Sequence, residues 1–243
     1  MPVYLTEIMQ QKFYLVAVAG GQGIRMGVSV PKQFLEIGGK AILRRTIEAF
    51  VKVFPEIHVI TVLPEACFAY WKKYCMEHDF NVPQTLVPGG LTRYHSVLAA
   101  LNKIPDGAIV AIHDGVRPLV SEELLQRMVK KMDACRALIP VLPSVDTLAV
   151  LRRGEGGELK DVEGRYVERS EIFRVQTPQI FHSEDIKAAY SGAFDPSFTD
   201  DASVARRKNI PLSYIEGERL NIKITTAADL EFAQMVLEAK GLF

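Results

Sequence analysis

A glycine-rich turn followed by two cations is the first feature of this sequence that can do chemistry. The turn, Ala19-Gly20-Gly21-Gln22-Gly23, comes directly after the apolar run Phe13 to Val18, and Arg25 and Lys32 lie beyond it. Glycines allow close backbone approaches that side chains forbid, so the N–H groups of such a turn can cradle phosphate oxygens. The cations can meet the charge of a polyphosphate held there. The stretch therefore predicts a nucleoside triphosphate site.

Two common phosphate-binding motifs do not fit this stretch. The Walker pattern G-x-x-x-x-G-K-[ST] ends in Gly-Lys-Ser/Thr, which the stretch does not contain. The dinucleotide fingerprint G-x-G-x-x-G would begin at Gly21 and Gly23, but Met26 stands where Gly or Ala is required. Neither a P-loop nor a dinucleotide-binding turn is predicted.

Other polar residues also follow apolar runs that are typical of strands. In open parallel sheets, ligands bind outside the carboxyl ends of the strands, where loops leave for helices. We therefore expect these polar groups to share one crevice. They are Gly20 to Arg25, Gly89-Gly90 with Arg93 and Ser96, Asp114 with Arg117, and Asp146-Thr147.

Strand and helix patterns alternate over the first 142 residues, which predicts a largely parallel, right-handed sheet with helices on both faces. Expected strands are Phe13 to Val18, Glu56 to Leu63, Val82 to Val87, Gly107 to His113 and Arg136 to Leu142. Expected helices are Lys40 to Val53, Pro64 to His78, Thr92 to Lys103 and Ser121 to Ala134.

The pattern changes between Ser144 and Ser170, where no helix-length apolar periodicity occurs. Two strand-like runs flank the turn-rich Gly154 to Gly157, which predicts a hairpin. Because an isolated hairpin is marginal in water, we expect this arm to lie on a second subunit.

The last third of the chain predicts a return to the sheet near Ile172 to Val175. One alternative for Thr177-Pro178 is a turn before an edge strand, although the full string Q-T-P-Q-x-F around it indicates more. For Asp200 and Asp201, the alternative is that they are simply acids in the first turn of a helix. Leu212 to Glu216 and Asn221 to Thr225 are expected to be closing strands. Thr226 and Asp229 predict a capping box for the final helix.

Composition excludes several functional classes. The 243-residue chain is 48% hydrophobic and 24% charged, as expected for one soluble α/β domain. Lys plus Arg and Asp plus Glu each number 29, so no basic field predicts nucleic acid as a partner. No apolar run approaches the roughly 18 residues of a membrane span, so we expect no membrane partner. Three scattered cysteines and the lack of a signal peptide predict a cytoplasmic protein.

Nine short strings in register resemble the cytidylyltransferases that act on 2-C-methyl-D-erythritol 4-phosphate and on pentitol phosphates. They are A-G-G-x-G-x-R-M, P-K-Q, G-G-x-x-R-x-x-S, H-D-x-x-R-P, D-T, E-R-S, Q-T-P-Q-x-F, T-D-D-A-S and N-I-K-I-T. The resemblance implies a Rossmann-like nucleotidyltransferase domain at residues 13–243, preceded by an extension at 1–12. It also implies a homodimer that exchanges a β-arm at about residues 144–170.

The chemistry of such an enzyme is attack by a phosphomonoester oxygen on the α-phosphorus of CTP, with pyrophosphate as the leaving group. The second pKa of a phosphomonoester is near 6, so the nucleophile is already a dianion at neutral pH and needs no general base. Two anions must instead be brought together, which positive side chains and Mg²⁺ achieve.

For the nucleotide, the resemblance implies that Arg25 and Lys32 contact the triphosphate and stabilise the transition state. CTP would be held by the backbone of the glycine turn and recognised by a second group. The turn residues are Ala19, Gly20, Gly21 and Gly23, and the second group is Gly90, Arg93 and Ser96. Asp114 would lie beside the reacting phosphates and the polyol, near the Mg²⁺ ion.

For the acceptor, the resemblance implies that Arg169 and Lys223 position the phosphate of a sugar alcohol. Thr147, Thr177 and Thr199 would lie nearby. Arg117 is a further candidate, with an ordinary salt bridge as its alternative role. Because Thr147 and Arg169 lie on the arm, they are expected to serve the site of the other subunit.

The identity of the acceptor is open between two branches. Val18-Ala19-Gly20-Gly21 and Val116 favour the pentitol phosphates, whereas Glu168-Arg169-Ser170 and Arg93-x-x-Ser96-Val97 favour methylerythritol phosphate. Because Arg169 belongs to the acceptor-binding part, we expect the product 4-diphosphocytidyl-2-C-methyl-D-erythritol, a precursor in non-mevalonate isoprenoid synthesis. A non-catalytic nucleotide sensor is the alternative from another class. It would not need to keep Arg25, Lys32, Asp114 and Lys223 together.

Overall fold

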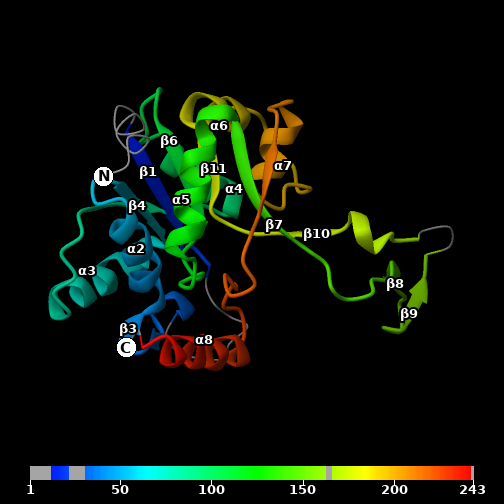
Figure 1. The fold of residues 1–243 in the computed structure, drawn as a ribbon, viewed down its shortest axis with the longest axis horizontal. Coiled ribbons are helices and arrows are strands. Elements are labelled where there is room, and N and C mark those ends of the chain that lie inside the picture. The colour runs from blue at the N-terminus through cyan, green and yellow to red at the C-terminus, as the bar shows by residue number, and fades with distance from the viewer. Residues whose placement is uncertain (1–11, 22–30, 163–165, 242–243) are drawn as a thin grey trace.

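The computed structural model describes residues 12–21, 31–162 and 166–241 (Figure 1). Gly23, Arg25 and the predicted extension, apart from its last residue, lie outside these ranges. A central sheet contains eight strands, in the order β10-β7-β11-β6-β1-β4-β5, with β12 paired to β7. These strands are β1 Phe13–Val18, β4 His58–Leu63, β5 Gln84–Pro88, β6 Ile109–Asp114, β7 Ala137–Pro143, β10 Phe173–Val175, β11 Gln179–His182 and β12 Ser213–Glu216.

The predicted mostly parallel sheet is confirmed. Strand β1 pairs in parallel with β4 and β6, β4 with β5, and β7 with β12. Only β10 and β11, among the described strands of this sheet, run antiparallel to their neighbours.

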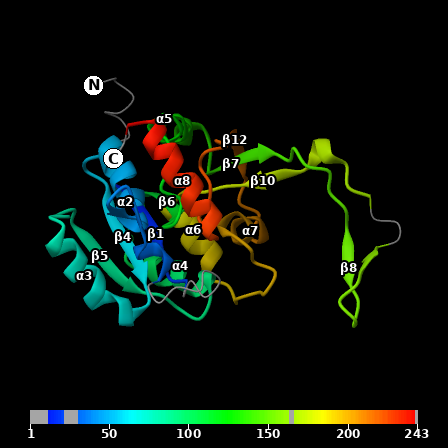
Figure 2. The ribbon, with the colours of Figure 1, turned by 90° about the horizontal axis from the view of Figure 1, so that it is seen from below.

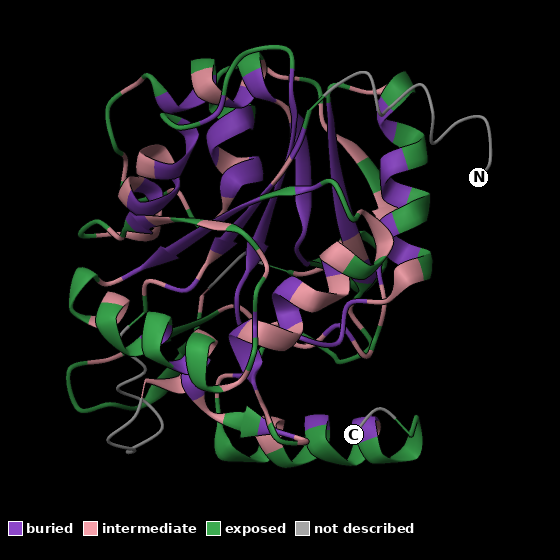
Figure 3. Cartoon of the chain, turned by 90° about the vertical axis from the view of Figure 1, so that its left-hand side faces the viewer, coloured by how far each residue is buried: buried purple, intermediate pink, exposed green. Residues whose placement is uncertain are grey.

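Helices cover both faces of the sheet because side chains alternate along its strands. On β1, Leu15 packs with helices α2, α3 and α5, whereas Val16 packs with α4, α6 and α7. The helices are α2 Ile42–Val53, α3 Phe68–Glu77, α4 Arg93–Leu101, α5 Glu122–Lys131, α6 Ser183–Tyr190, α7 Asp201–Arg207 and α8 Ala227–Ala239. Buried residues therefore concentrate in the strands and on the inner faces of the helices (Figure 3).

Helix α8 closes a smaller cluster beneath the sheet, as Figure 1 shows. Its Ala233 and Leu237 pack with Ile37 and Ile224. Ile37 belongs to a short hairpin of β2 Glu36–Ile37 and β3 Lys40–Ala41, which follows a 3₁₀ turn, η2, at Lys32–Phe34. The predicted capping box of α8 is present. None of the helices in the described ranges is long and apolar enough to cross a membrane.

The predicted hairpin arm is present and stands away from the body in both Figure 1 and Figure 2. Its strands, β8 Leu151–Arg153 and β9 Leu159–Asp161, pair only with each other among the described strands. All six of their residues are exposed. At the base of the arm, Val141 to Pro143 of β7 pair with Phe173 to Val175 of β10. A further 3₁₀ turn, η5 Arg169–Glu171, precedes β10.

Two strand predictions in the last third are wrong. The strand after Thr177-Pro178 is not at an edge, because β11 lies between β6 and β7. Pro178 precedes the first strand residue and therefore removes no hydrogen bond from the ladder. Asn221 to Thr225 form no strand. The backbone of this segment instead contacts loops, as in the bond from the Ile224 N–H to the Val116 carbonyl, 2.9 Å long.

One helix begins later than predicted. Pro64 has a ψ of 134° and is not helical, and a 3₁₀ turn, η3 Glu65–Cys67, separates it from α3. Trp71 and Tyr74 are buried and form the core face of this helix. A short 3₁₀ turn, η4 Met132–Ala134, likewise ends α5.

Candidate active site

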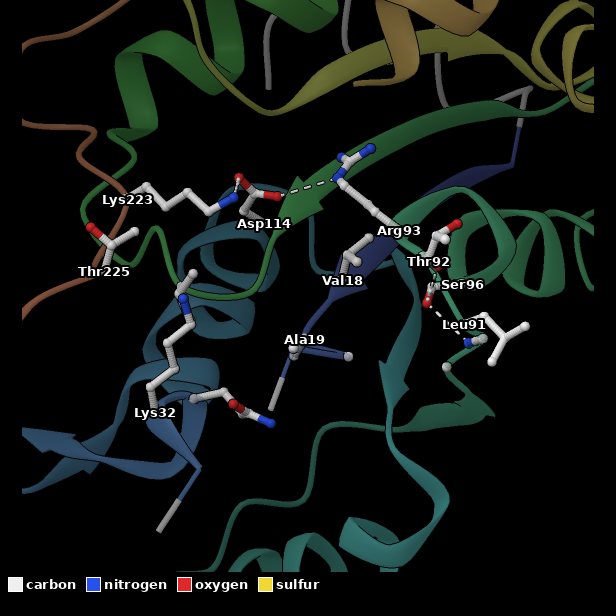
Figure 4. Close-up of a pocket in the computed structure, with 16 residues that line it drawn as sticks. Val18, Ala19, Lys32, Leu91, Thr92, Arg93, Ser96, Asp114, Lys223 and Thr225 are labelled. Atoms are coloured by element: carbon white, nitrogen blue, oxygen red, sulfur yellow. Dashed lines mark hydrogen bonds and ion pairs between the residues drawn. The ribbon is translucent and has the colours of Figure 1, made fainter. Parts of the chain in front are cut away.

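A cavity of about 1130 Å³ opens at the carboxyl ends of β1, β5 and β6 (Figure 4). The pairing of Val18 with Asp114 places the ends of β1 and β6 side by side. Predicted residues that line the cavity are Ala19, Gly20, Gly21, Lys32, Gly90, Arg93, Ser96, Asp114 and Lys223. The expected common crevice is therefore present in part, since Arg117 and Asp146-Thr147 do not line it.

Asp114 is the centre of charge in this cavity. Its carboxylate lies 3.0 Å from Lys223 Nζ, 3.4 Å from Arg117 Nε and 3.6 Å from Arg93 Nε. Burial alone would raise the pKa of this carboxyl group, but the positive charges of Arg93, Lys223 and Arg117 hold it well below its usual range. Asp114 is therefore an anion that gathers cations from three segments of the chain.

Arg93 begins helix α4 and also contacts a second carboxylate. Its Nη1 and Nη2 donate to Asp201 Oδ1 and Oδ2 at 2.8 and 2.7 Å. Asp201 is completely buried and also accepts a 2.6 Å hydrogen bond from the Tyr190 hydroxyl. Interpretation of Asp201 as only a first-turn acid is wrong, because Asp200 caps α7 and Asp201 is the counter-ion of Arg93.

The loop after β5 is held by Ser96. The Gly90 N–H donates to Ser96 Oγ at 3.0 Å, and this hydroxyl donates to the Thr92 carbonyl, also at 3.0 Å. A Cβ atom at Gly90 would come within 2.4 Å of His95 Cβ, so no other residue fits without movement of the backbone. Gly90 and Ser96 both line the cavity, and Ser96 lies across from Lys32 (Figure 4).

Arg117 fixes the segment that carries Lys223. Its Nη1 donates to the Asn221 carbonyl at 2.7 Å, and Asn221 Nδ2 donates to the Thr177 carbonyl at 2.8 Å. Thr177 Oγ1 in turn accepts the Asp114 N–H at 3.1 Å. Arg117 and Thr177 were predicted to bind substrate, but neither lines the cavity, and both position Asp114 and its partners.

His113 precedes Asp114 in β6 and is a core residue. It is fully buried, and its Nε2 lies 3.1 Å from the Arg117 carbonyl, to which it can donate. Burial lowers its pKa to about 4, so the imidazole is neutral at physiological pH. It supports the turn that carries Asp114 and Arg117.

Three further predicted acceptor-binding residues lie outside the cavity. Thr147 is on the arm, and so is Arg169, whose Nη1 lies 3.4 Å from the Val145 carbonyl. Thr199 lines a second cavity of about 640 Å³, between β7, β10, β12 and the start of α7. Arg25 and Gly23 cannot be placed, since they lie outside the described ranges. Among the described residues of one chain, the cavity contains the cations Lys32, Arg93 and Lys223, which can meet the charge of a nucleotide. It does not contain Thr147 or Arg169 of the arm.

The sequence did not single out Gln33 and Thr225, although both line the cavity. Their signal was present, because Gln33 belongs to the P-K-Q string and Thr225 ends N-I-K-I-T. Periodicity gives no such information, since buried polar residues in short turns follow no regular spacing.

A magnesium ion is compatible with Asp114 as a single protein ligand. The described residues contain no group of three or more His, Cys, Asp or Glu side chains that could enclose a metal. Mg²⁺ is commonly bound by one or two carboxylates together with substrate phosphates, rather than by an all-protein cage. Asp114 Oδ1 has only the 3.6 Å contact with Arg93 among the ion pairs described. The residues fit an ion shared with a triphosphate.

Comparison with known proteins agrees with this site. The profile of the 2-C-methyl-D-erythritol 4-phosphate cytidylyltransferase family matches residues 13–239. The enzyme of that name from Bacteroides thetaiotaomicron is 43% identical over 223 residues, which are 92% of this chain and 98% of the relative. The one from Porphyromonas gingivalis strain W83 is 40% identical over 94% of this chain and 99% of its own.

Solved structures agree as well. 4-Diphosphocytidyl-2C-methyl-D-erythritol synthase from Anaerococcus prevotii is 26% identical, with a TM-score of 0.75 over 94% of this chain and 99% of its own. The 2-C-methyl-D-erythritol 4-phosphate cytidylyltransferase from Thermus thermophilus is 28% identical, with a TM-score of 0.70 and the same coverage. With its cluster of cations around Asp114, this chain belongs to the 2-C-methyl-D-erythritol 4-phosphate cytidylyltransferase family.

Proposed function

We infer that this chain transfers the cytidylyl group of CTP to 2-C-methyl-D-erythritol 4-phosphate and releases pyrophosphate. The observation that carries this inference is the cavity at the carboxyl ends of β1, β5 and β6, where Arg93, Lys223 and Arg117 surround Asp114. The family membership of the chain supplies the nucleotide and the acceptor.

The described residues can carry out this reaction by positioning and charge stabilisation. The acceptor phosphate is a dianion at neutral pH, so its oxygen can attack the α-phosphorus without a general base. Lys32 and Lys223 both line the cavity and can neutralise the two anions as they approach each other. A Mg²⁺ ion held by Asp114 and the triphosphate would neutralise further charge on the phosphates.

The acceptor site requires a second copy of the chain in this proposal. Arg169 and Thr147 lie on an arm that extends away from the cavity of their own chain (Figure 1). Apolar side chains along the arm and its base are unusually exposed, which favours a protein surface against them. They are Val145, Leu148, Leu151, Leu159, Phe173 and Val175. A homodimer with exchanged arms would cover these side chains and complete both sites.

Pyrophosphate release tests the proposed function. The purified chain is incubated with CTP, Mg²⁺ and either 2-C-methyl-D-erythritol 4-phosphate or ribitol 5-phosphate, and pyrophosphate is measured over time. We expect rapid release with the methylerythritol phosphate and little with the pentitol phosphate. Release with the pentitol phosphate alone would overturn the choice of acceptor. CTP binding with no release for either acceptor would favour a nucleotide sensor.

A further inference from the structure

Gln33 combines two properties that no other described residue combines. Its side chain lines the active-site cavity, and the residue is 1% exposed. Its amide nitrogen is buried and has no hydrogen-bond partner among the described residues. His113 Nδ1 and Asn221 Oδ1 are also buried and unpaired in the described part of the chain, but neither residue lines the cavity.

An unpaired buried amide is costly in a folded protein. Loss of hydrogen bonds to water without replacement costs about 1–3 kcal/mol, so native proteins pair the large majority of such groups. The other buried glutamines follow this rule. Gln179 donates to Asp200 Oδ2 at 2.8 Å and accepts the Ala202 N–H at 2.7 Å. Gln176 is likewise paired at both ends, to the segment that includes Glu218 and Asn221.

Gln33 keeps its place in the cavity wall because a backbone hydrogen bond and the packing of its neighbour Phe34 hold the η2 turn. Gln33 lies in η2, where the Phe34 N–H donates to the Pro31 carbonyl at 2.9 Å. The neighbouring Phe34 ring is anchored against Tyr70 and Trp71, with ring centroids 4.8 and 5.8 Å apart. The terminal torsion of a glutamine amide has a broad energy profile, which allows its N–H groups to turn toward a ligand.

The place of Gln33 in the cavity points to phosphate rather than to the base. Gln33 follows Lys32, and Lys32, Lys223 and Thr225 lie on one side of the cavity (Figure 4). Leu91, from the loop after β5, and Ser96, from α4, lie on the opposite side. A neutral N–H donor on the residue that follows Lys32 can approach a phosphate oxygen without adding to the charge repulsion among the cations.

We propose that the Gln33 side-chain amide donates a hydrogen bond to a phosphate oxygen of the bound nucleotide. The proposal rests on the proposed function, since it concerns the same CTP site. Among the described residues the amide nitrogen has no hydrogen-bond partner, and the nucleotide supplies one. Gln33 is then a substrate-binding residue beside Lys32, and the free energy lost by burying its amide is recovered when CTP binds.

The test is Gln33→Met, which keeps the length of the side chain and removes the amide. We expect CTP to bind about tenfold more weakly by calorimetry, because a hydrogen bond to a charged group is lost. The unfolding temperature of the ligand-free variant should equal or exceed that of the wild type, because no protein partner is lost. Cytidine, which has no phosphate, should bind both proteins equally. Gln33→Glu, which places an anion there, should weaken CTP binding more than Gln33→Met does.

The matched control is Gln179→Met, which removes a buried amide that is paired at both ends. It should lower the unfolding temperature of the ligand-free protein, because the buried Ala202 N–H and the half-buried Asp200 carboxylate lose their partner. A comparable drop for Gln33→Met, or unchanged affinity for CTP, would overturn the role of Gln33. An equal loss of cytidine affinity would overturn the contact with phosphate. In both cases, CTP binding and turnover by the wild type would leave the proposed function intact, whereas a wild type without CTP binding would overturn both.

Discussion

Asp201 holds Arg93 through a two-pronged ion pair, with N···O distances of 2.7 and 2.8 Å. The pair joins the first residue of α7 to the first residue of α4, which are 108 positions apart in the sequence. With both terminal nitrogens engaged, Arg93 presents Nε toward Asp114 at 3.6 Å. Asp201 therefore determines the orientation of a cavity cation without lining the cavity itself.

Replacement of Asp201 by Asn should destabilise the fold and impair catalysis together. Asn keeps the shape but leaves Arg93 without its buried counter-ion, which typically costs about 3–5 kcal/mol. Urea unfolding measures the loss. Tyr190→Phe is the control, since it removes only the 2.6 Å hydroxyl bond to Asp201 and should cost less. Equal stability of Asp201→Asn and the wild type would contradict the structural role of the pair.

Lys32→Ala should lower turnover far more than it weakens CTP binding. Lys32 lines the cavity on the side of Lys223, where charge on the reacting phosphates would build (Figure 4). Loss of one such electrostatic group typically lowers the rate about 10²–10³-fold. Steady-state kinetics combined with CTP titration separates the two effects. Near-normal turnover would remove Lys32 from the catalytic group.

Stability should fall as the pH drops from about 6.5 to about 4, and His113 should contribute to that fall. Burial lowers the pKa of His113 from 6.5 to about 4, against the opposing effects of the Arg117 carbonyl and of Asp114. In this window the unfolded chain binds the proton that the folded chain excludes, so stability present above pH 6.5 is lost on acidification. The shift corresponds to about 3 kcal/mol.

His113→Gln isolates this contribution, because Gln can still donate toward the Arg117 carbonyl but does not titrate. Urea unfolding at pH 7, 6, 5 and 4 should show a shallower loss of stability for the variant than for the wild type. Parallel curves for the two proteins would mean that His113 does not exclude a proton in the folded state.

The working unit should be a dimer in which each site contains residues of both chains. Arg25→Ala and Arg169→Ala homodimers are then both poor enzymes, while a mixed dimer holds one doubly altered site and one intact site. After co-refolding, random pairing places an intact site at roughly a quarter of all positions. Pyrophosphate release by the mixture should exceed that of either parent. A rate no higher than the parents would show that the arm serves its own chain.

The nucleotide side of the site was predictable because it depends on the ends of parallel strands. Once β1 and β6 are known to be adjacent, Ala19 and Asp114 must emerge at the same edge of the sheet. The glycine turn and the apolar runs of the strands are local patterns, so both can be recognised from the sequence alone.

What the sequence did not reveal depends on long-range partners. Strand β11 contains only Gln179 to His182, and its central position follows from pairing with β6 and β7 rather than from its own pattern. The alternation of Ile222 and Lys223 mimics a strand, but Arg117 and Gln176 hold this segment through the Asn221 carbonyl. The burial of Asp201 likewise depends on Arg93, which is distant in sequence.

The pairing of β7 with β10 at the base of the arm allows the arm and the body of the protein to change independently in evolution. Val141 and Val175 are register partners. The strand before the arm, β7, is therefore already paired with the strand after it, β10. Insertions or deletions between these strands can alter the length and sequence of the arm without shifting any strand of the body. The arm can therefore diversify in length and sequence while the cavity around Asp114 stays unchanged.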